Sequence, residues 1–262
     1  MAENILEIKD LSKYFGGLAA VSNCSLNVKK GSITGIIGPN GSGKTTLFNL
    51  ISGNLNSNKG IVNFNGENIT NTPAYELFSK GLLRTFQIAH EFTNLTVLEN
   101  LMMVPGNQSG EKLSNVFLKP SLIHKEEDLI KQKAKEVVEF LNLGHLSNEL
   151  AGNLSGGQKK LLELGRTMMV DAKLVLLDEV GAGVNRTLLK DLGTAIEKLN
   201  KEKGYTFCMI EHDMDFIERL CDPVIVMAEG SVLFEGSVEN AKKDEKVVES
   251  YLGRGSKLKD EY

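Results

Sequence analysis

The chain has 262 residues, of which 41% are hydrophobic and 24% are charged, and its formal net charge is -4. This composition is that of a globular protein with a sizeable core, enough for one α/β domain or for one domain with an added lobe. The slightly acidic balance provides no basic field for a polyanion, which argues against nucleic acid as a partner. The longest apolar runs, Leu174–Leu177 and Val224–Ala228, have the length of strands and are far short of the ~20 residues that a membrane-spanning helix needs.

The N-terminus and the cysteines indicate in which cellular compartment the chain is expected. Met1–Asn4 contains an acidic residue and no apolar core of signal-peptide length follows, so export is not expected. Cys24, Cys208 and Cys221 are odd in number, widely separated and without metal-type spacing, which is typical of buried thiols in a reducing compartment. We therefore expect the chain to reside in the cytoplasm.

The N-terminal part of the chain predicts a small antiparallel sheet. Apolar residues in Ile5–Ile8 and Ala20–Val28 indicate two strands around a turn at Phe15–Gly17. The run Ile61–Phe64 followed by Asn65-Gly66 predicts a hairpin, because this pair tolerates the positive φ angles that such turns require.

A glycine-rich segment fits the phosphate-loop pattern G-x-x-x-x-G-K-[ST] and follows a buried strand predicted at 32–37. Its glycines let the backbone present several N–H groups inward, and the helix predicted over 45–51 adds about half a positive charge at its N-terminus. Lys44 supplies a point charge for the outer phosphates, and the Thr45 hydroxyl is placed to ligate magnesium. The segment predicts a triphosphate site, with a plain glycine turn as the alternative; it consists of Gly38, Pro39, Asn40, Gly41, Ser42, Gly43, Lys44, Thr45 and Thr46.

The middle of the chain changes from strand to helix signals. Thr72-Pro73 predicts the start of a short helix, with threonine as its cap and Gly81 as its end, and a strand over 82–86 leads to Gln87. From about residue 97 helical periodicity takes over, and Pro105–Ser121 interrupts it as a loop-like insertion. We interpret 88–164 as a helical lobe inserted into an α/β core; its clearest amphipathic stripe consists of Ile130, Ala134, Val137, Val138 and Leu141.

Strand and helix signals then alternate. The strands predicted at Leu174–Asp178, Tyr205–Ile210 and Val224–Met227 are separated by helices over 187–201 and 214–220. This alternation is typical of a parallel sheet with helices on both faces. From residue 235 onward, we expect two short helical pieces and a charged tail over 254–262.

Three further motifs carry chemistry. Asp178 and Glu179 end a buried strand, where Asp178 can hold a magnesium ion and Glu179 can face a γ-phosphate and polarise an attacking water; a solvated acidic pair is the alternative. His212 follows another strand end, although a lone histidine is more often structural. A glycine pentad precedes a predicted helix over 159–169 and, taken alone, is a turn with a serine cap; its residues are Leu154, Ser155, Gly156, Gly157 and Gln158.

Together with Gln87, these motifs occur in the order and spacing of ATP-binding cassette (ABC) ATPases, which the chain resembles over essentially its whole length. The resemblance implies an α/β fold with a P-loop NTPase (RecA-like) core and a mainly parallel sheet, an N-terminal antiparallel β subdomain and an inserted α-helical subdomain. We expect one ABC domain over 1–262, with the β subdomain and phosphate-loop part of the core in 1–87. The helical subdomain is expected in 88–164, the rest of the core in 165–236 and C-terminal helices in 237–262.

Within this family, the chain is similar to the ATP-binding subunits of branched-chain amino-acid importers. The similarity lies in short sequence motifs, most of which are also found in importers of urea or other polar solutes. They are Phe15-Gly16-Gly17, Arg84-Thr85-Phe86-Gln87, Thr96–Asn100, Glu211–Met214 and Val248–Gly253.

The resemblance also implies roles for single residues. Phe15 would stack on adenine, with a place in the core of the small sheet as the alternative, and Gln87 would contact magnesium or the attacking water. His212 would touch the γ-phosphate. Since two cassettes of this family sandwich two ATP molecules, the residues Leu154–Gln158 would act on the ATP of the opposite subunit, and Asn185 would lie at the dimer seam.

Three residues depart from the family pattern. Val180 replaces the proline that usually follows Asp-Glu, and Arg186 replaces a proline after Asn185. Neither position supplies catalytic atoms, so the departures put the rigidity of the chain in question rather than its activity. Gly156 stands where many amino-acid importer subunits have a bulkier residue, which weakens the substrate assignment slightly.

The resemblance implies an ATP- and Mg²⁺-dependent subunit that couples hydrolysis in a cassette homodimer or heterodimer to separate permease subunits. It also implies an extracytoplasmic solute-binding protein and a peripheral position on the cytoplasmic face of the membrane. The residues Phe92, Leu95, Val97 and Leu98 would form a docking groove for the permease, unless they fill the core of the lobe.

Two other classes of function are weighed against this reading. A soluble cassette of DNA repair or translation usually needs two cassettes or a long coiled coil, for which this chain has no room. A non-hydrolysing regulatory cassette is suggested only by Val180 and Arg186.

Overall fold

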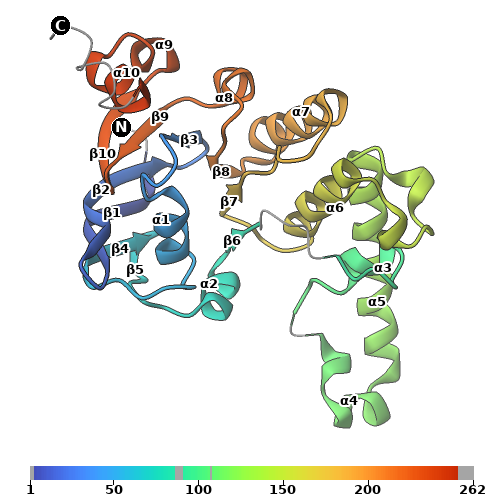
Figure 1. Ribbon diagram of the computed structural model, residues 1–262. Coiled ribbons are helices and arrows are strands. Elements are labelled where there is room, and N and C mark those ends of the chain that lie inside the picture. Colours follow the sequence, from blue (N-terminus) through green and yellow to red (C-terminus); the bar gives the residue numbers. More distant parts are fainter. Residues whose placement is uncertain (1–2, 86–90, 107, 253–262) are drawn as a thin grey trace, which may run out of the picture. The chain divides into compact units, whose positions relative to one another are not determined.

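The computed structural model describes residues 3–85, 91–106 and 108–252, which fold into two compact units (Figure 1). The first unit is built from Met1–Arg84, Lys173–Gly181 and Glu197–Tyr262, and the second from Thr85–Ala172 and Ala182–Ile196. The first contains both β-sheets and the second is helical. The predicted α/β class is therefore confirmed.

The four-stranded sheet is antiparallel, with the strand order β2-β1-β4-β5. Its strands are β1 (Asn4–Phe15), β2 (Leu18–Lys29), β4 (Lys59–Phe64) and β5 (Glu67–Asn68). The two predicted N-terminal strands and their turn are confirmed, and so is the hairpin, in which Asn65 and Gly66 have φ angles of 50° and 81°.

The six-stranded sheet has the order β10-β9-β3-β8-β7-β6, and each neighbouring pair is parallel except β9 and β10. The residues of β3, β7 and β8 are all buried, as expected for a parallel sheet that is covered on both faces. The strands are β3 (Ile33–Ile37), β6 (Leu82–Arg84), β7 (Leu174–Asp178), β8 (Thr206–Ile210), β9 (Val224–Ala228) and β10 (Ser231–Gly236).

Strand β10 is missing from the sequence prediction, which ended the sheet at Met227. Glu229 and Gly230 have φ angles of 48° and 81° and reverse the chain, so that β10 returns antiparallel to β9. The residues of β10 are mostly half-buried, which explains why they give no clear apolar run.

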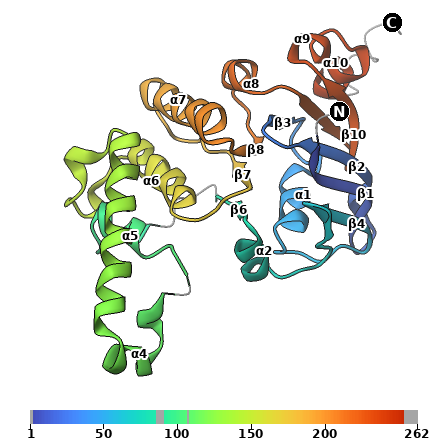
Figure 2. The same cartoon turned by 180° about the vertical axis from the view of Figure 1, so that it is seen from behind.

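The helices of the first unit are short, and α1 is central to its packing. Figure 2 shows α1 next to strands β1 and β4. Phe48 and Leu47 of α1 are fully buried in one hydrophobic core with residues of both sheets, such as Leu6 of β1 and Ile36 of β3. Helix α2 begins after Pro73, which is itself the N-cap, so the predicted cap at Thr72 is wrong by one residue. The helices are α1 (Lys44–Ile51), α2 (Ala74–Lys80), α8 (Met214–Leu220), α9 (Val238–Ala241) and α10 (Glu245–Leu252).

In the second unit, helices α3, α5 and α6 pack against one another. One prediction for this unit is wrong. The insertion Pro105–Ser121 is not a plain loop, because it contains the 3-10 turn η1, helix α4 and the start of α5. Helix α7 begins in this unit at Arg186. The elements are α3 (Val97–Met102), η1 (Ser109–Glu111), α4 (Leu113–Leu118), α5 (Pro120–Phe140), η2 (Gly144–Leu146), η3 (Ala151–Asn153), α6 (Gly156–Met168) and α7 (Arg186–Lys203).

The amphipathic stripe predicted for α5 is confirmed, since Ala134, Val137 and Val138 are buried. The segment before α3 is fixed by polar contacts: Thr96 and Glu99 form a capping box, and the buried Asn100 side chain donates to the carbonyl oxygens of Phe92, Leu95 and Thr96. The motif Thr96–Asn100 therefore has a structural role at the start of this helix.

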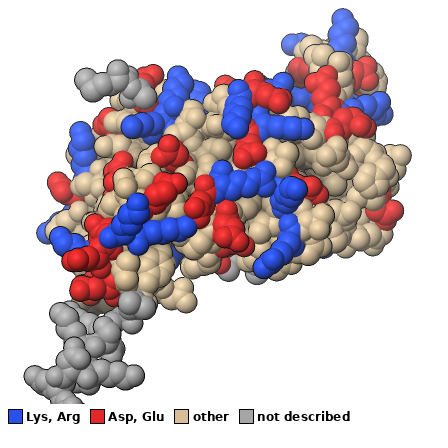
Figure 3. Space-filling view, turned by 90° about the horizontal axis from the view of Figure 1, so that it is seen from above, with Lys and Arg blue, Asp and Glu red and all other residues tan. Residues whose placement is uncertain are grey.

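The charges on the face of the molecule drawn in Figure 3 are mixed. Lysine and arginine side chains lie among aspartate and glutamate side chains over this face, without a large area of one sign. This agrees with the small net charge of -4.

The central position of Phe48 gives a stability prediction. Replacing Phe48 with alanine opens a cavity between the two sheets, so we expect the free energy of unfolding to fall by about 3–5 kcal/mol, measured by urea denaturation. The control is Phe78→Ala on α2, where the ring is 39% exposed; a loss there as large as that of Phe48→Ala would contradict the shared core.

Candidate nucleotide-binding site

The phosphate loop approaches two strands so closely that two of its residues must be glycine. A Cβ at Gly38 would collide with the carbonyl oxygen of Met227 in β9, and one at Gly43 with the carbonyl oxygen of Ala20 in β2. Their φ angles, 149° and 99°, are also ones that other residues rarely adopt. The glycines of the motif are thus explained by the fold, and the loop is held against both sheets.

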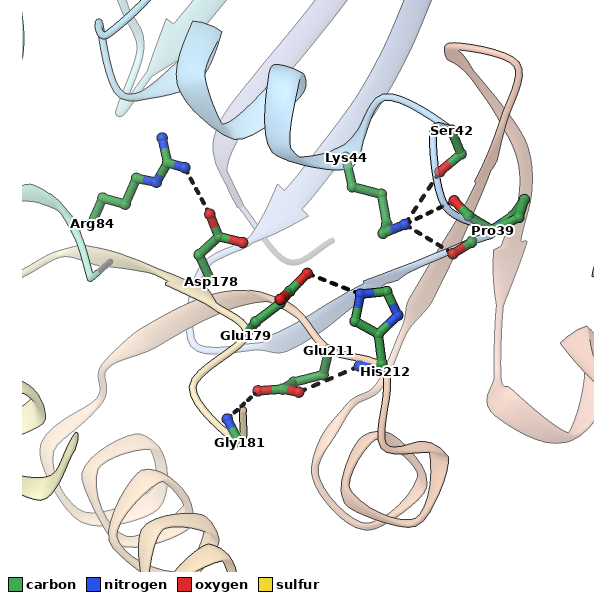
Figure 4. Close-up of polar contacts among 10 residues, drawn as sticks. Pro39, Ser42, Lys44, Arg84, Asp178, Glu179, Gly181, Glu211 and His212 are labelled. Atoms are coloured by element: carbon green, nitrogen blue, oxygen red, sulfur yellow. Dashed lines mark hydrogen bonds and ion pairs between the residues drawn. The ribbon is translucent and has the colours of Figure 1, made fainter. Parts of the chain in front are cut away.

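Lys44, the first residue of α1, lies over the loop. Its Nζ donates to the carbonyl oxygens of Gly38 at 2.8 Å and Pro39 at 3.0 Å, and to Ser42 Oγ at 3.4 Å (Figure 4). Burial lowers the pKa of the Lys44 ammonium group, while the charges of Glu179 and Asp178 act in the opposite direction. The loop therefore concentrates one positive charge at the N-terminus of a helix, an arrangement suited to a phosphate group.

A pocket of about 590 Å³ lies in front of this loop. Phe15 lines it with a ring that is 48% exposed, so the alternative that this ring fills the core of the small sheet is wrong. The Nζ of Lys13 lies 5.3 Å from the centre of the Phe15 ring. The pocket is lined by Phe15, Leu18, Ala19, Ala20, Asn40, Gly41, Gly43, Lys44, Thr45, Thr46, Glu179, His212 and Glu229.

The structure brings Glu179 and His212 together at the edge of the pocket. Their Oε1 and Nε2 atoms are 2.9 Å apart, although the residues come from the ends of two different parallel strands (Figure 4). Glu179 has a φ angle of 49°, an unfavourable backbone conformation for this residue, and its N–H donates to the carbonyl oxygen of Ile210. Residues with an unfavourable backbone conformation cluster at functional sites, so Glu179 is a candidate functional residue.

Asp178 does not line the pocket, because its side chain faces Arg84. Oδ2 of Asp178 accepts from Nη2 of Arg84 at 2.7 Å, and the two side chains are only 6% and 7% exposed. Nη1 of Arg84 also donates to Asn49 Oδ1 at 2.6 Å and to Ser52 Oγ at 3.1 Å. Arg84 thus connects β7 with α1. Its role was not predicted; the signal in the sequence is a charged residue within a short apolar strand.

Two further residues next to the site are explained only by the structure. Glu211 accepts from the N–H groups of Gly181 at 2.8 Å and His212 at 3.3 Å, and so ties the loop after Glu179 to the histidine. Burial raises the pKa of the Glu211 carboxyl group, which these hydrogen bonds oppose. Tyr251 of α10 lies beside the phosphate loop; burial raises the pKa of its hydroxyl, and a hydrogen bond from the Gly38 backbone lowers it by a smaller amount.

The glycine pentad starts helix α6 in the second unit. Ser155 and Gln158 form a capping box, in which the N–H of Ser155 donates to Gln158 Oε1 at 2.9 Å. Gly157 leaves room for Leu188. A Cβ at Gly156 would lie 3.9 Å from the carbonyl oxygen of Gly183, an ordinary contact distance, so the fold would accept a side chain at residue 156.

The remaining residues singled out in the sequence are Asn185, Val180, Arg186 and Gln87. Asn185 caps α7, because its Oδ1 accepts from the N–H of Leu188 at 2.9 Å. Val180 is buried and Arg186 is exposed at the first position of α7. Gln87 lies outside the described residues.

The four apolar residues predicted to form a docking groove differ in burial. Val97 is fully buried in the helical unit, Phe92 is exposed, and Leu95 and Leu98 are half-buried. Val97 is therefore a core residue, and only the other three offer a surface.

Comparisons with known proteins agree with this geometry. Residues 21–182 match the family described as ABC transporter. The chain belongs to the ABC transporter family. It is 45% identical to the probable branched-chain amino acid transport ATP-binding protein LivG of Archaeoglobus fulgidus, over 95% of both chains, and 42% identical to the LivG protein of Methanocaldococcus jannaschii, over 95% of this chain and 97% of the other.

A solved structure shares the whole ABC fold. The crystal structure of the ADP conformation of an ATP-binding cassette of an ABC transporter superimposes with a TM-score of 0.82 at 41% identity, covering 96% of this chain and 100% of the other. The chain is accordingly an ATP-binding cassette with an α/β P-loop fold, and its family identifies it as an ATPase. Among the described residues of this ABC protein, no helix is long and apolar enough to cross a membrane.

The ion pair of Arg84 gives the next prediction. Arg84→Met leaves the Asp178 carboxylate buried without its cation, so we expect the free energy of unfolding to fall by about 3–5 kcal/mol at pH 7. Arg84→Lys, measured alongside by urea denaturation, keeps a charge and should lose less. Equal stability of the Arg84→Met variant and the parent chain would show that the pair does not fix this strand end.

Proposed function

We propose that the chain is the ATP-hydrolysing subunit of a membrane importer for branched-chain amino acids. The observation that carries this proposal is the similarity to proteins named for branched-chain amino acid transport, at 45% and 42% identity over 95% of the chain. The related cassette in its ADP conformation supports nucleotide binding at the equivalent fold.

ATP would bind in the pocket in front of the phosphate loop. The exposed ring of Phe15 offers a stacking surface for adenine at one side of the pocket. The loop backbone and the N-terminus of α1 receive the β- and γ-phosphates, with Lys44 exchanging loop carbonyl oxygens for phosphate oxygens. Thr45 and Thr46 also line the pocket, and their hydroxyl groups can donate to phosphate oxygens.

For hydrolysis, we assign the proton-accepting role to Glu179. Its carboxylate lines the pocket and can take the proton of a water that attacks the γ-phosphate. His212 contacts this carboxylate at 2.9 Å, and we propose that it also contacts the γ-phosphate. Glu211 fixes the backbone on both sides of this pair, and we propose that Gln87 completes the water site.

Mg²⁺ is part of this proposal. A magnesium ion usually takes one or two protein oxygens in addition to phosphates and waters, so it needs no dense cluster of carboxylates. Thr45 lines the pocket, and its hydroxyl fits the ion. The Asp178 side chain lies outside the pocket lining and accepts from Arg84, so it would have to leave this ion pair at least in part to reach the ion or its waters. When bound, Mg²⁺ neutralises charge on the β- and γ-phosphates. Thr45, Asp178 and Gln87 are the residues that we propose hold it or its waters.

The partners follow from the same assignment. We propose that Leu154–Gln158 act on the ATP of a second cassette, identical or related, since the capped start of α6 presents backbone N–H groups suited to phosphate. Asn185 would lie at the seam between the cassettes. Separate permease subunits would contain the pathway through the membrane, an extracytoplasmic binding protein would deliver the amino acid, and this chain would lie on the cytoplasmic face.

The role of Glu179 predicts a kinetic effect. Glu179→Gln keeps the size of the side chain but removes the base, so we expect the ATPase rate to fall about 100-fold or more while ATP binding persists. The control is Glu229→Gln, the same change at another carboxylate that lines the pocket. ATPase assays and equilibrium ATP binding measure both effects. If Glu179→Gln hydrolysed ATP at the parental rate, Glu179 would not be the general base.

The transport function is tested in cells. Uptake of labelled leucine should be lost with Lys44→Ala and kept with Lys59→Ala, an exposed lysine on β4, while urea uptake is the same in all strains. Unchanged leucine uptake with Lys44→Ala would refute the proposed substrate, and a selective loss of urea uptake would assign the subunit to a polar-solute importer instead.

A further inference from the structure

The insertion after α3 ends in a structured tip that the nucleotide site does not use. We define the α4 tip as residues 112–125, which comprise α4 and the first part of α5. In Figure 1, α4 lies beside the start of α5, at the end of that helix away from α3 and α6. The tip is therefore the far end of the helical unit rather than part of its core.

The apolar side chains of the α4 tip face water. Leu113, Phe117 and Leu118 are 75%, 77% and 78% exposed, and Val116 and Leu122 beside them are also exposed. Single exposed apolar residues are ordinary on protein surfaces, whereas five within ten consecutive positions are a feature that needs a cause.

The fold holds these side chains outward. The backbone N–H and Oγ of Ser109 donate to the carboxylate of Glu126 at 2.8 and 2.7 Å, which closes the loop that carries α4. Nδ2 of Asn115 donates to the Ser109 carbonyl oxygen at 3.0 Å, and the N–H of Lys119 donates to the Asn115 carbonyl oxygen at 2.7 Å. The tip is thus an ordered element, and its apolar residues are not the side chains of a collapsed loop.

The charge of the α4 tip is opposite to that of the whole chain. Lys112, Lys119 and Lys125 are exposed, and no aspartate or glutamate lies between 112 and 125, so this segment carries +3 in a chain whose net charge is -4; the exposed Glu111 borders it on one side. The acidic residues Glu126–Asp128 border the tip on its other side, directly after Lys125, and begin about 9 Å along α5 from its start. Lys112 and Lys119 are the lysines next to the exposed Leu113 and Leu118 in the sequence. Exposed apolar side chains with lysines around them suit a surface that is apolar inside and negative outside.

We propose that the α4 tip inserts into the headgroup region of an anionic lipid bilayer. Phe117, Leu118 and Leu113 would enter the boundary between headgroups and acyl chains, and the three lysines would lie among the lipid phosphates. Such a contact goes beyond ATP hydrolysis and permease docking, because it gives the helical unit an attachment to the membrane of its own. It requires neither nucleotide nor permease, which separates its test from that of the proposed function.

The apolar part of the proposal is tested by vesicle binding of the full chain. Vesicles of phosphatidylcholine with phosphatidylglycerol in equal amounts should bind the protein, and pure phosphatidylcholine vesicles should bind it weakly. Phe117→Ser should lower the partition coefficient about tenfold, because one aromatic side chain no longer enters the bilayer. The matched control is Tyr75→Ser on α2, where the side chain is 73% exposed, and it should leave binding unchanged.

The electrostatic part is tested by a triple substitution. Lys112→Gln, Lys119→Gln and Lys125→Gln together should lower binding to the anionic vesicles about 100-fold and remove most of its salt dependence. The control changes three exposed lysines of α7, with Lys198→Gln, Lys201→Gln and Lys203→Gln, and has the same net charge. ATPase activity and the thermal midpoint should be the same in all variants, because none of these residues lies in the nucleotide pocket or the core.

Three results would overturn the proposal. One is the absence of binding to anionic vesicles, and another is an equal loss of binding in the tip variants and in their controls. The third is binding to detergent-solubilised permease that depends on Phe117 in the absence of any vesicle binding, which would assign the α4 tip to a protein partner.

Discussion

The close approach of the phosphate loop to two strand carbonyls is the constraint on which the nucleotide site depends. Gly38 lies against Met227 of β9 and Gly43 against Ala20 of β2, so the loop is held by both sheets at once. Helix α1, which starts from this loop at Lys44, is buried in the core that the sheets share. Packing of the core therefore sets the position of the N-terminus of α1 and of Lys44, its first residue.

The carboxylates of the site are positioned by buried polar contacts. Arg84 pairs with Asp178 and also bonds to side chains of α1, which connects the end of β7 with the helix behind the phosphate loop. Glu211 makes a similar connection between the loop after Glu179 and the backbone of His212. Hydrogen bonds to charged groups are stronger than neutral ones, so these contacts hold the strand ends in a defined arrangement.

Local patterns made most of the fold predictable. Buried strands such as β7 and the Asn65-Gly66 hairpin are encoded in consecutive residues, and so is the glycine loop with Lys44. Strand β10 and helix α4 were not predicted, because their side chains are partly or fully exposed and follow no core periodicity. The partners of Arg84 and Glu211 lie 94 and 30 positions away in the sequence and could not be predicted, since no local pattern encodes such contacts.

The backbone of Glu179 shows how function and stability compete in this chain. A φ angle of 49° costs a residue such as glutamate about 1 kcal/mol, and glycine or asparagine would adopt it more easily. Selection for a more stable fold alone would therefore tend to remove the carboxylate that faces His212. Efforts to make the protein more heat-resistant by consensus or computational design should keep this position fixed, because its most stabilising substitutions are the ones that would abolish the proposed chemistry.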